Sequence, residues 1–361
     1  MKVDPTGWLG LRVAYEADVV SGATVAVKAG GAYQRNNPAA DVVTTASVRD
    51  LRSLATGAVS LRHEDVTFTT SYAYSTERDY RSHSINPAIR TDVYGHNTQL
   101  EISWAKSIDE VCDRVQGTSD AVTRRRALED ATGCFTKDPL RTGRDLGVDG
   151  FQGSWSQSWT PILATQIVYT AQLIHGFQSN PYRSVIVAQG LRAQEHHPED
   201  RARHALAVRA NLYLKPIKGA LRLMLRAYRD TWDLRSGTAE LEFERYFGEA
   251  LRASLRGRIY RQSGALFFSD DYTGGDPPAG PKGAYFSGDR ELSPFTSALG
   301  GVRATYTFRP REGRLLGLAR DARASGTLDV IGFSYDEFTL GGAPIENARA
   351  LVAGLSLAAS F

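Results

Sequence analysis

The sequence has only two cysteines, Cys112 and Cys134, in a chain of 361 residues. Two cysteines do not make a disulfide-rich scaffold, and neither belongs to a CxxC pair. No uninterrupted apolar run approaches the roughly 20 residues that a membrane helix requires. GxSxG and HExxH, which mark common hydrolases and metalloproteases, are also missing. The sequence is therefore atypical of a helical membrane protein and of these enzyme classes.

An excess of charge of one sign is also missing, because 43 Lys and Arg residues are balanced by 40 Asp and Glu residues. This balance argues against a nucleic-acid-binding protein, whose basic residues cluster on one face. The N-terminal stretch MKVDPTGWLGLRVAYEADVV has no charged start, apolar core and cleavage site of a secretory signal. Taken alone this indicates a cytoplasmic protein. The rest of the chain indicates the cell envelope, so we expect that the signal peptide was removed by processing or lost through a misassigned start codon.

Apolar and polar residues alternate along much of the chain. In ALRLMLRAYRD, residues 220–230, the apolar Leu221, Leu223 and Leu225 alternate with Arg222 and Arg226. A period of two predicts a β-strand with one apolar and one polar face. Equivalent segments recur from 8–20 to 348–361 and predict about fourteen strands, while a missing N-terminal hairpin would raise the number to sixteen.

Strand length and loop length distinguish a membrane barrel from a soluble β-sandwich or a secreted β-solenoid, which can show the same alternation. The predicted strands are about ten residues or longer, as membrane strands are. Tight connections such as HED at 63–65 alternate with mostly longer ones near 21–51, 108–149, 177–200 and 264–295. Outer-membrane barrels have short periplasmic turns and long extracellular loops. We therefore predict one all-β domain over residues 1–361, a transmembrane antiparallel β-barrel of the Gram-negative outer membrane, surrounded by lipid.

Several stretches resemble a family of Gram-negative envelope proteins catalogued as domain-of-unknown-function family 3570. They are YEADVVSGATV (15–25), DVVTTAS (41–47), SYAYSTERDYRS (71–82), NPYRSV (180–185), PEDRARHALAVRANLYL (198–214) and YRDTWDLRSGTAELEF (228–243). The chain departs from the family at Gly237, where a His is usual, and in its cysteine-containing insertion. The resemblance implies an outer-membrane barrel and no particular activity. The final residue, Phe361, also resembles the C-terminal signal read by the barrel assembly machinery.

The family-like motifs end or begin predicted strands on the extracellular side, so their polar residues are expected to gather at the rim of the barrel. They are Asp79, Arg81, Tyr182, Arg183, Arg203, His204, Asp230 and Asp233. One interpretation is a mouth that binds a ligand, metal or partner. The other, which we favour, is a set of ion pairs and interfacial aromatic residues that fix loop geometry.

The adjacent loop QEHHPEDRARH contains Glu195, His196, His197, Glu199 and Asp200. Imidazole and carboxylate groups are suitable metal ligands. The two histidines are adjacent, without helical or hairpin spacing, so a solvated loop is the favoured interpretation, and neither a metal nor a cofactor is predicted.

The two cysteines lie in the segment 108–149, which is predicted to be an extracellular loop insertion with a short helix over Thr118–Thr132. Extracellular space is oxidising, so a Cys112–Cys134 disulfide is expected, with two free thiols as the alternative.

Charges on the polar faces of three consecutive strands predict a charged lumen. Positive, negative and positive columns follow one another: Arg222 and Arg226, then Glu240, Glu242 and Glu244, then Arg252, Arg256 and Arg258. In a water-filled lumen they would act as a charge-selective constriction, whereas in a packed lumen they would form an ion-pair network. The leading hypothesis is a passive pore. The alternative is a non-conducting scaffold that binds a periplasmic or lipoprotein partner, and an enzyme with an active site at the rim is the least favoured.

Overall fold

The computed structural model describes residues 2–22, 25–27, 42–44, 48–117, 122–187, 191–269, 285–309, 320–340, 343–344 and 347–360. These residues form strands, loops and three short 3₁₀ turns: η2 (Val122–Arg124), η4 (Lys215–Ile217) and η5 (Arg290–Leu292). Within these ranges no helix is long and apolar enough to traverse a bilayer.

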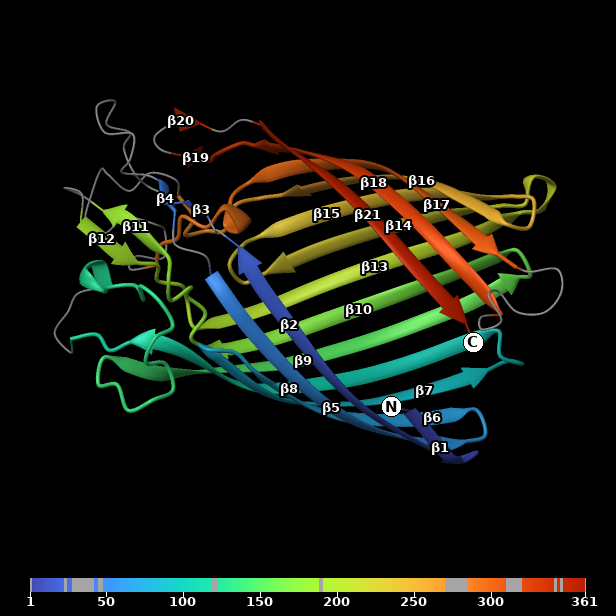
Figure 1. The fold of residues 1–361 in the computed structure, drawn as a ribbon, viewed down its shortest axis with the longest axis horizontal. Helices are drawn as coiled ribbons and strands as arrows, with labels where there is room; N and C mark the ends of the chain where they lie inside the picture. The colour runs from blue at the N-terminus through green and yellow to red at the C-terminus, as the bar shows by residue number, and fades with distance from the viewer. Residues whose placement is uncertain are drawn as a thin grey trace.

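One antiparallel sheet of fifteen strands forms the body of the molecule. Figure 1 shows that this sheet curls round a central axis as a barrel. Hydrogen-bonded neighbours follow the order of the chain, so successive strands are joined as hairpins, and β1 and β21 end the order. The strands are β1 (Lys2–Thr6), β2 (Leu9–Gly22), β5 (Val48–His63), β6 (Val66–Thr76), β7 (Tyr80–Val93), β8 (Thr98–Arg114), β9 (Arg141–Thr160), β10 (Leu163–Gly176), β13 (Asp200–Leu214), β14 (Gly219–Asp230), β15 (Arg235–Phe247), β16 (Leu251–Gln262), β17 (Phe295–Phe308), β18 (Asp321–Tyr335) and β21 (Asn347–Ser360).

The fourteen predicted strands correspond to β2 and to every later strand of this sheet, which confirms the predicted barrel architecture. The fifteenth strand, β1, was not predicted. It has five residues and pairs with β2 only from Leu9 to Arg12.

The two ends of the barrel differ in the length of their connections (Figure 1). At the turn end, most connections span a few residues, and Glu64, Tyr94 and Lys218 reverse the chain in left-handed backbone conformations with φ of 50°, 53° and 49°. The connection between β17 and β18 is longer and spans 309–320. At the loop end, three small hairpins project beyond the barrel: β3 (Val25–Val27) with β4 (Val42–Thr44), β11 (Ser184–Val187) with β12 (Leu191–Gln194), and β19 (Thr339–Leu340) with β20 (Ala343–Pro344). Short turns at one end and long loops at the other are the pattern of an outer-membrane barrel.

Alternation gives the wall an apolar outer face and a polar inner face. Leu223, Leu241, Leu255 and Val302 are among the large side chains exposed on the outer surface of neighbouring strands. Aromatic side chains join this surface near the turn end: Trp159, Phe247, Tyr306 and Phe308. Aromatic girdles of this kind lie at the boundary between lipid and water in membrane barrels.

The predicted loop insertion is shorter than expected. Strand β8 continues to Arg114 and β9 begins at Arg141, so the connection spans only 115–140. Both ends of the expected 108–149 segment are strand. This is because β8 and β9 continue to pair beyond the band of apolar residues on the outer face of the barrel. The expected disulfide is present and joins Cys112 of β8 to Cys134 of the loop.

The helix expected over Thr118–Thr132 is largely wrong. Residues 118–121 lie outside the described ranges, 122–124 form η2, and 125–132 are not helical. Tertiary contacts account for this difference. Leu128 is buried against the disulfide and its backbone N–H donates to Pro181, while the Asp130 carboxylate accepts the backbone N–H of Thr132. These bonds replace those that a helix would make. The prediction on Phe361 also falls outside the described residues.

Candidate functional site

The inner faces of β14, β15 and β16 place the predicted columns of charge side by side. The register puts Arg222 opposite Glu242, and Glu242 opposite Arg256 on the next strand. A guanidinium nitrogen of Arg222 lies 3.2 Å from Glu242 and another lies 3.3 Å from Glu244. Glu244 is also 3.6 Å from Arg252, so it connects two arginine columns. Opposite charges on adjacent strands stabilise the wall and hold these side chains in place.

Arg256 makes its ion pair across an intervening strand. Its guanidinium bonds to Asp329 of β18 at 2.5 Å and 3.1 Å, passing over Gly301 of β17. Gly301 is paired with both Arg256 and Asp329, and a Cβ at this position would lie 1.9 Å from the Asp329 carboxylate. The bridge therefore requires glycine on the middle strand.

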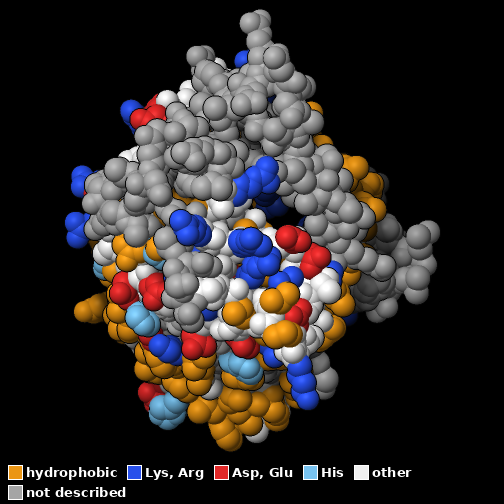
Figure 2. Space-filling view, turned by 90° about the vertical axis from the view of Figure 1, so that its left-hand side faces the viewer, with side chains coloured by type: hydrophobic (Ala, Val, Ile, Leu, Met, Phe, Trp, Pro, Cys, Tyr) orange, Lys and Arg blue, Asp and Glu red, His pale blue; other side chains and the backbone are white. Residues whose placement is uncertain are grey.

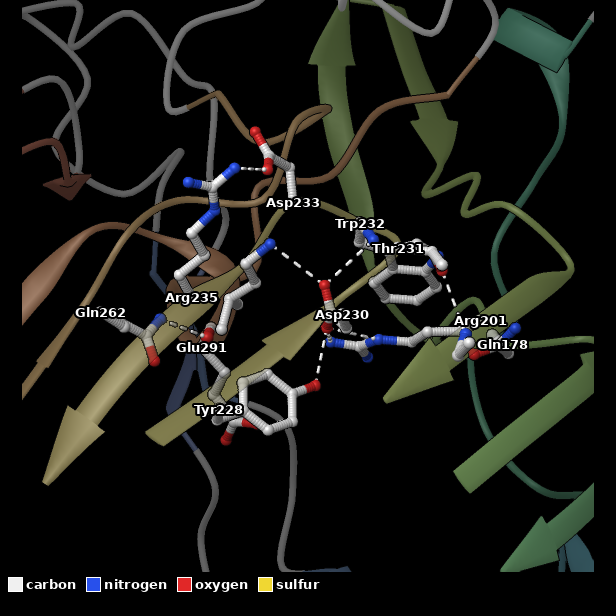
Figure 3. Close-up of polar contacts among 12 residues, drawn as sticks. Gln178, Arg201, Tyr228, Asp230, Thr231, Trp232, Asp233, Arg235, Gln262 and Glu291 are labelled. Carbon is white, nitrogen blue, oxygen red and sulfur yellow. Dashed lines mark hydrogen bonds and ion pairs between the residues drawn. The ribbon is translucent and has the colours of Figure 1, made fainter. Parts of the chain in front are cut away.

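The mouth of the barrel contains a compact polar cluster around Asp230 (Figure 3). The Arg201 side chain donates to the Asp230 carboxylate at 2.5 Å and 2.9 Å, and the Tyr228 hydroxyl donates to it at 2.7 Å. Backbone N–H groups of Trp232 and Leu234 donate to the other carboxylate oxygen, each at 3.0 Å. The Asp230 side chain is fully buried. The carboxylate therefore holds the β14–β15 turn and the start of β13 together.

An aromatic layer covers this cluster. The Arg201 guanidinium lies 3.7 Å from the centroid of the Trp232 ring, and Trp232 packs edge-on against Phe267. Leu234, Ala265 and Leu292 complete a buried apolar group formed by the β14–β15 turn and the loop after β16. Stacking on Trp232 shields the Arg201–Asp230 pair from water, which strengthens it.

The other predicted rim residues do not converge on this cluster. The Tyr182 hydroxyl donates to Asp79, and Arg81 lies over the Phe135 ring at 4.2 Å. Asp233 pairs with the exposed Arg235 at 2.9 Å. The predicted rim is thus divided among several separate contacts, in keeping with the interpretation of ion pairs that fix loops. Figure 2, which faces the loop end, shows charged side chains distributed over this surface and hydrophobic ones on the flank below.

Arg203 and His204 lie on opposite faces of β13 because neighbouring residues of a strand alternate. Arg203 faces the lumen, whereas His204 faces outward and bonds to the Tyr169 hydroxyl at 2.8 Å. The two side chains therefore point away from each other, although both residues border one cavity.

The loop that was expected to be solvated is partly buried. The Glu195 side chain has no exposed area and His197 retains 5%. Arg183 forms ion pairs with Asp289 and, at 3.8 Å, with Glu195. Ser287 and the Gly288 backbone N–H also donate to Glu195, which ties the segment between β12 and β13 to the segment before η5. The prediction failed because it could not anticipate that residues 285–293 cover this loop.

Burial shifts the pKa values of both groups in this loop. It raises the pKa of Glu195 to about 7, with Arg183 opposing the shift, and it lowers the pKa of His197 to about 4. Glu195 Oε2 and His197 Nε2 lie 3.7 Å apart. The described residues contain no group of three or more His, Cys, Asp and Glu side chains arranged for a metal ion.

Sequence reasoning missed Arg201, Trp232, Asp289 and Asp329 as parts of these contacts. Arg201 and Trp232 belong to the family-like stretches, which was the one available signal. Asp289 and Asp329 carry no motif, and only the fold brings them to their arginine partners.

The fold is similar to that of a solved outer-membrane receptor, and two further structures match at lower scores. A siderophore receptor from Acinetobacter baumannii matches with a TM-score of 0.50 and 10% identity, covering 98% of this chain and 55% of the receptor. The receptor PirA from Pseudomonas aeruginosa matches at 0.47 and 12%, covering 99% and 55%. A bacterial polysaccharide outer-membrane secretin matches at 0.47 and 8%, covering 99% and 88%. The chain spans about half the length of the receptors it matches.

No curated protein matches the chain in sequence. A family model described as a protein of unknown function, DUF3570, matches residues 7–318. The chain therefore belongs to the DUF3570 family, and its fold is that of an outer-membrane β-barrel.

Proposed function

We propose that the protein is a passive pore of the outer membrane for small hydrophilic solutes. The observation that supports this proposal is the solvent exposure of ionised side chains inside the barrel. The side chain of Arg222 is 43% exposed and that of Arg252 is 39% exposed, although both face the lumen and both are in ion pairs. Guanidinium groups in a packed interior would be buried, so this exposure favours a lumen that contains water.

The number of long strands is compatible with a channel. Barrels of eight strands are filled by their own side chains, and porins of 16–18 strands enclose an aqueous channel. A barrel with fourteen long strands lies between them. The arginine and glutamate columns occupy one wall, so they would create a transverse electric field across a water-filled lumen.

Conductance in planar lipid bilayers tests this proposal. We expect stepwise ohmic currents in KCl, and a change of ion selectivity when Glu242→Gln removes a lumen charge. Glu249→Gln is the matched control because Glu249 is exposed in the turn between β15 and β16. A barrel that is correctly folded but silent in repeated reconstitutions would contradict the pore. It would favour the scaffold instead, for which co-purification of a periplasmic or lipoprotein partner is the expected result. The proposal assigns no catalytic role to any residue.

A further inference from the structure

A cavity of ≈ 420 Å³ lies on the inner wall formed by β9, β10, β13 and β14. Its floor consists of small or short side chains, because Ala205 of β13 pairs with Thr170 of β10, and Ala207 pairs with Val168. Three arginines surround this floor: Arg203, Arg209 and Arg226.

The strand register explains how the arginines surround the hollow. Arg203 and Arg209 lie on the same inner face of β13, on either side of the two alanines. Arg226 of β14 pairs with Ala207 from the other side. The rest of the polar lining comes from Gln152, Thr170, Gln172, His204 and Tyr228.

The side chains that line the cavity carry a net positive charge. Its lining includes three arginines and no Asp or Glu. The carboxylate opposite Arg203 in the register, Asp230, already accepts five hydrogen bonds from Arg201, Tyr228 and the turn backbone. A carboxylate has about four lone-pair positions, so Asp230 has none left for Arg203.

The three guanidinium groups retain unused donors. The buried Nε of Arg203 has no hydrogen-bond partner among the described residues. Arg209 donates to the Gln166 side chain at 2.9 Å, which uses one of its five N–H groups. Arg226 makes no ion pair within the described chain, and its nearest aromatic contact is the Tyr228 ring at 6.0 Å. Leaving such donors unpaired is costly, and an anionic ligand would satisfy them.

We propose that this cavity binds one small oxyanionic solute, of which inorganic phosphate is the simplest. Guanidinium groups bind the oxygens of phosphate and carboxylate in bidentate geometry, and amide N–H groups can add further donors. This inference rests on the proposed pore, because the cavity would be an anion-selective binding site along its lumen. Binding itself does not require conduction, so the two proposals can fail separately.

Two variants of the same strand provide a matched comparison. Arg226→Gln and Arg222→Gln each remove one lumen-facing positive charge from β14. Arg226 lines the cavity, whereas Arg222 lies four residues away and is paired with Glu242 and Glu244. Phosphate binding to the detergent-solubilised full chain is measured by ³¹P line broadening, and block of KCl current by phosphate is measured in bilayers. Heat-modifiable migration on gels verifies that each variant is folded, and Arg209→Gln replaces Arg226→Gln if the latter does not fold.

We expect Arg226→Gln to weaken phosphate binding about tenfold, the effect of losing one hydrogen bond to a charged group, and Arg222→Gln to leave it within about twofold. Equal losses in both variants would overturn the cavity as the site, because the total lumen charge would then explain binding. No binding to the folded wild-type protein would also overturn it, whether or not the barrel conducts. Specific binding to a barrel that carries no current would support the site and contradict the pore.

Discussion

Replacing Asp230 by Asn removes the buried negative charge that binds Arg201 and the β14–β15 turn at the mouth of the barrel. The Asp230 side chain is fully buried and Arg201 retains 8% exposure, so the substitution leaves a guanidinium with no counter-charge. The carboxylate also accepts the backbone N–H groups of Trp232 and Leu234. An amide offers one oxygen where the carboxylate offers two, so some of these donors lose their acceptor. Breaking a buried pair in this way typically costs 3–5 kcal/mol, and we expect about 3 kcal/mol or more for Asp230→Asn.

Urea unfolding of the barrel in phospholipid vesicles measures this cost, with Trp fluorescence as the signal. Asp233→Asn is the matched control from the same turn. Its side chain is 55% exposed and pairs with an exposed Arg235, so its loss should cost under about 1 kcal/mol. Adding Arg201→Met to Asp230→Asn should recover part of the lost stability, because the uncompensated charge is then gone. A cost for Asp230→Asn no larger than that of the control, or no coupling with Arg201, would refute the reasoning.

Four further predictions concern the loops and the wall. Burial raises the pKa of Glu195 to about 7, so folding favours its protonated form. The stability that this provides is lost as pH rises from the ordinary range of a carboxyl to about 7. Hydrogen-exchange protection factors over 177–199, corrected for the intrinsic exchange rate, should therefore fall from about pH 5 to about pH 7, and the same fall in Glu195→Gln would contradict this. Burial lowers the pKa of His197 to about 4, so its contribution has the opposite sign and is lost as pH falls below its ordinary range, a loss that His197→Gln should remove. Reduction of the Cys112–Cys134 disulfide should destabilise the loop by roughly 3 kcal/mol and speed trypsin cleavage after the exposed Arg124 and Arg126. Equal resistance with and without reductant would show that the buried contacts of Leu128 suffice. Arg256→Gln and Asp329→Asn should each lower the free energy of unfolding by under about 1 kcal/mol, because Arg256 is 32% exposed. The double variant should lose less than the sum of the two single losses. Strict additivity would show that the pair contributes nothing.

The strands could be predicted from the sequence because the environment of a barrel wall imposes a period of two. The signal failed beyond the apolar wall, where loops rather than lipid cover the ends of β8 and β9 and bury polar side chains. Asp113 of β8 and Arg141 of β9 lie there, so no apolar face marks these residues as strand. The short strand β1 could not be predicted either, since its five residues include Pro5 and show no clear alternation of apolar and polar side chains.

The charge columns could also be anticipated, because their members are on adjacent strands and alternation fixes the face of each. The rim could not, because its contacts depend on where long loops fold. Glu195 is buried by a segment almost a hundred residues later, through Ser287 and Gly288. Arg256 was expected to lie in the column beside the glutamates. Its bond to Asp329 depends on Gly301, whose importance becomes visible only when three strands are aligned.

Gly301 also helps to select a single register for the strands of the barrel. A slip of two residues along β17 keeps apolar side chains outside, so the lipid-facing pattern alone does not oppose it. Such a slip would place Leu299 or Arg303, the neighbouring inward residues, between Arg256 and Asp329. Either side chain would obstruct the bridge that Gly301 allows. The ion pair between β16 and β18 thus favours the native register over shifted registers that would bury the same apolar surface in lipid.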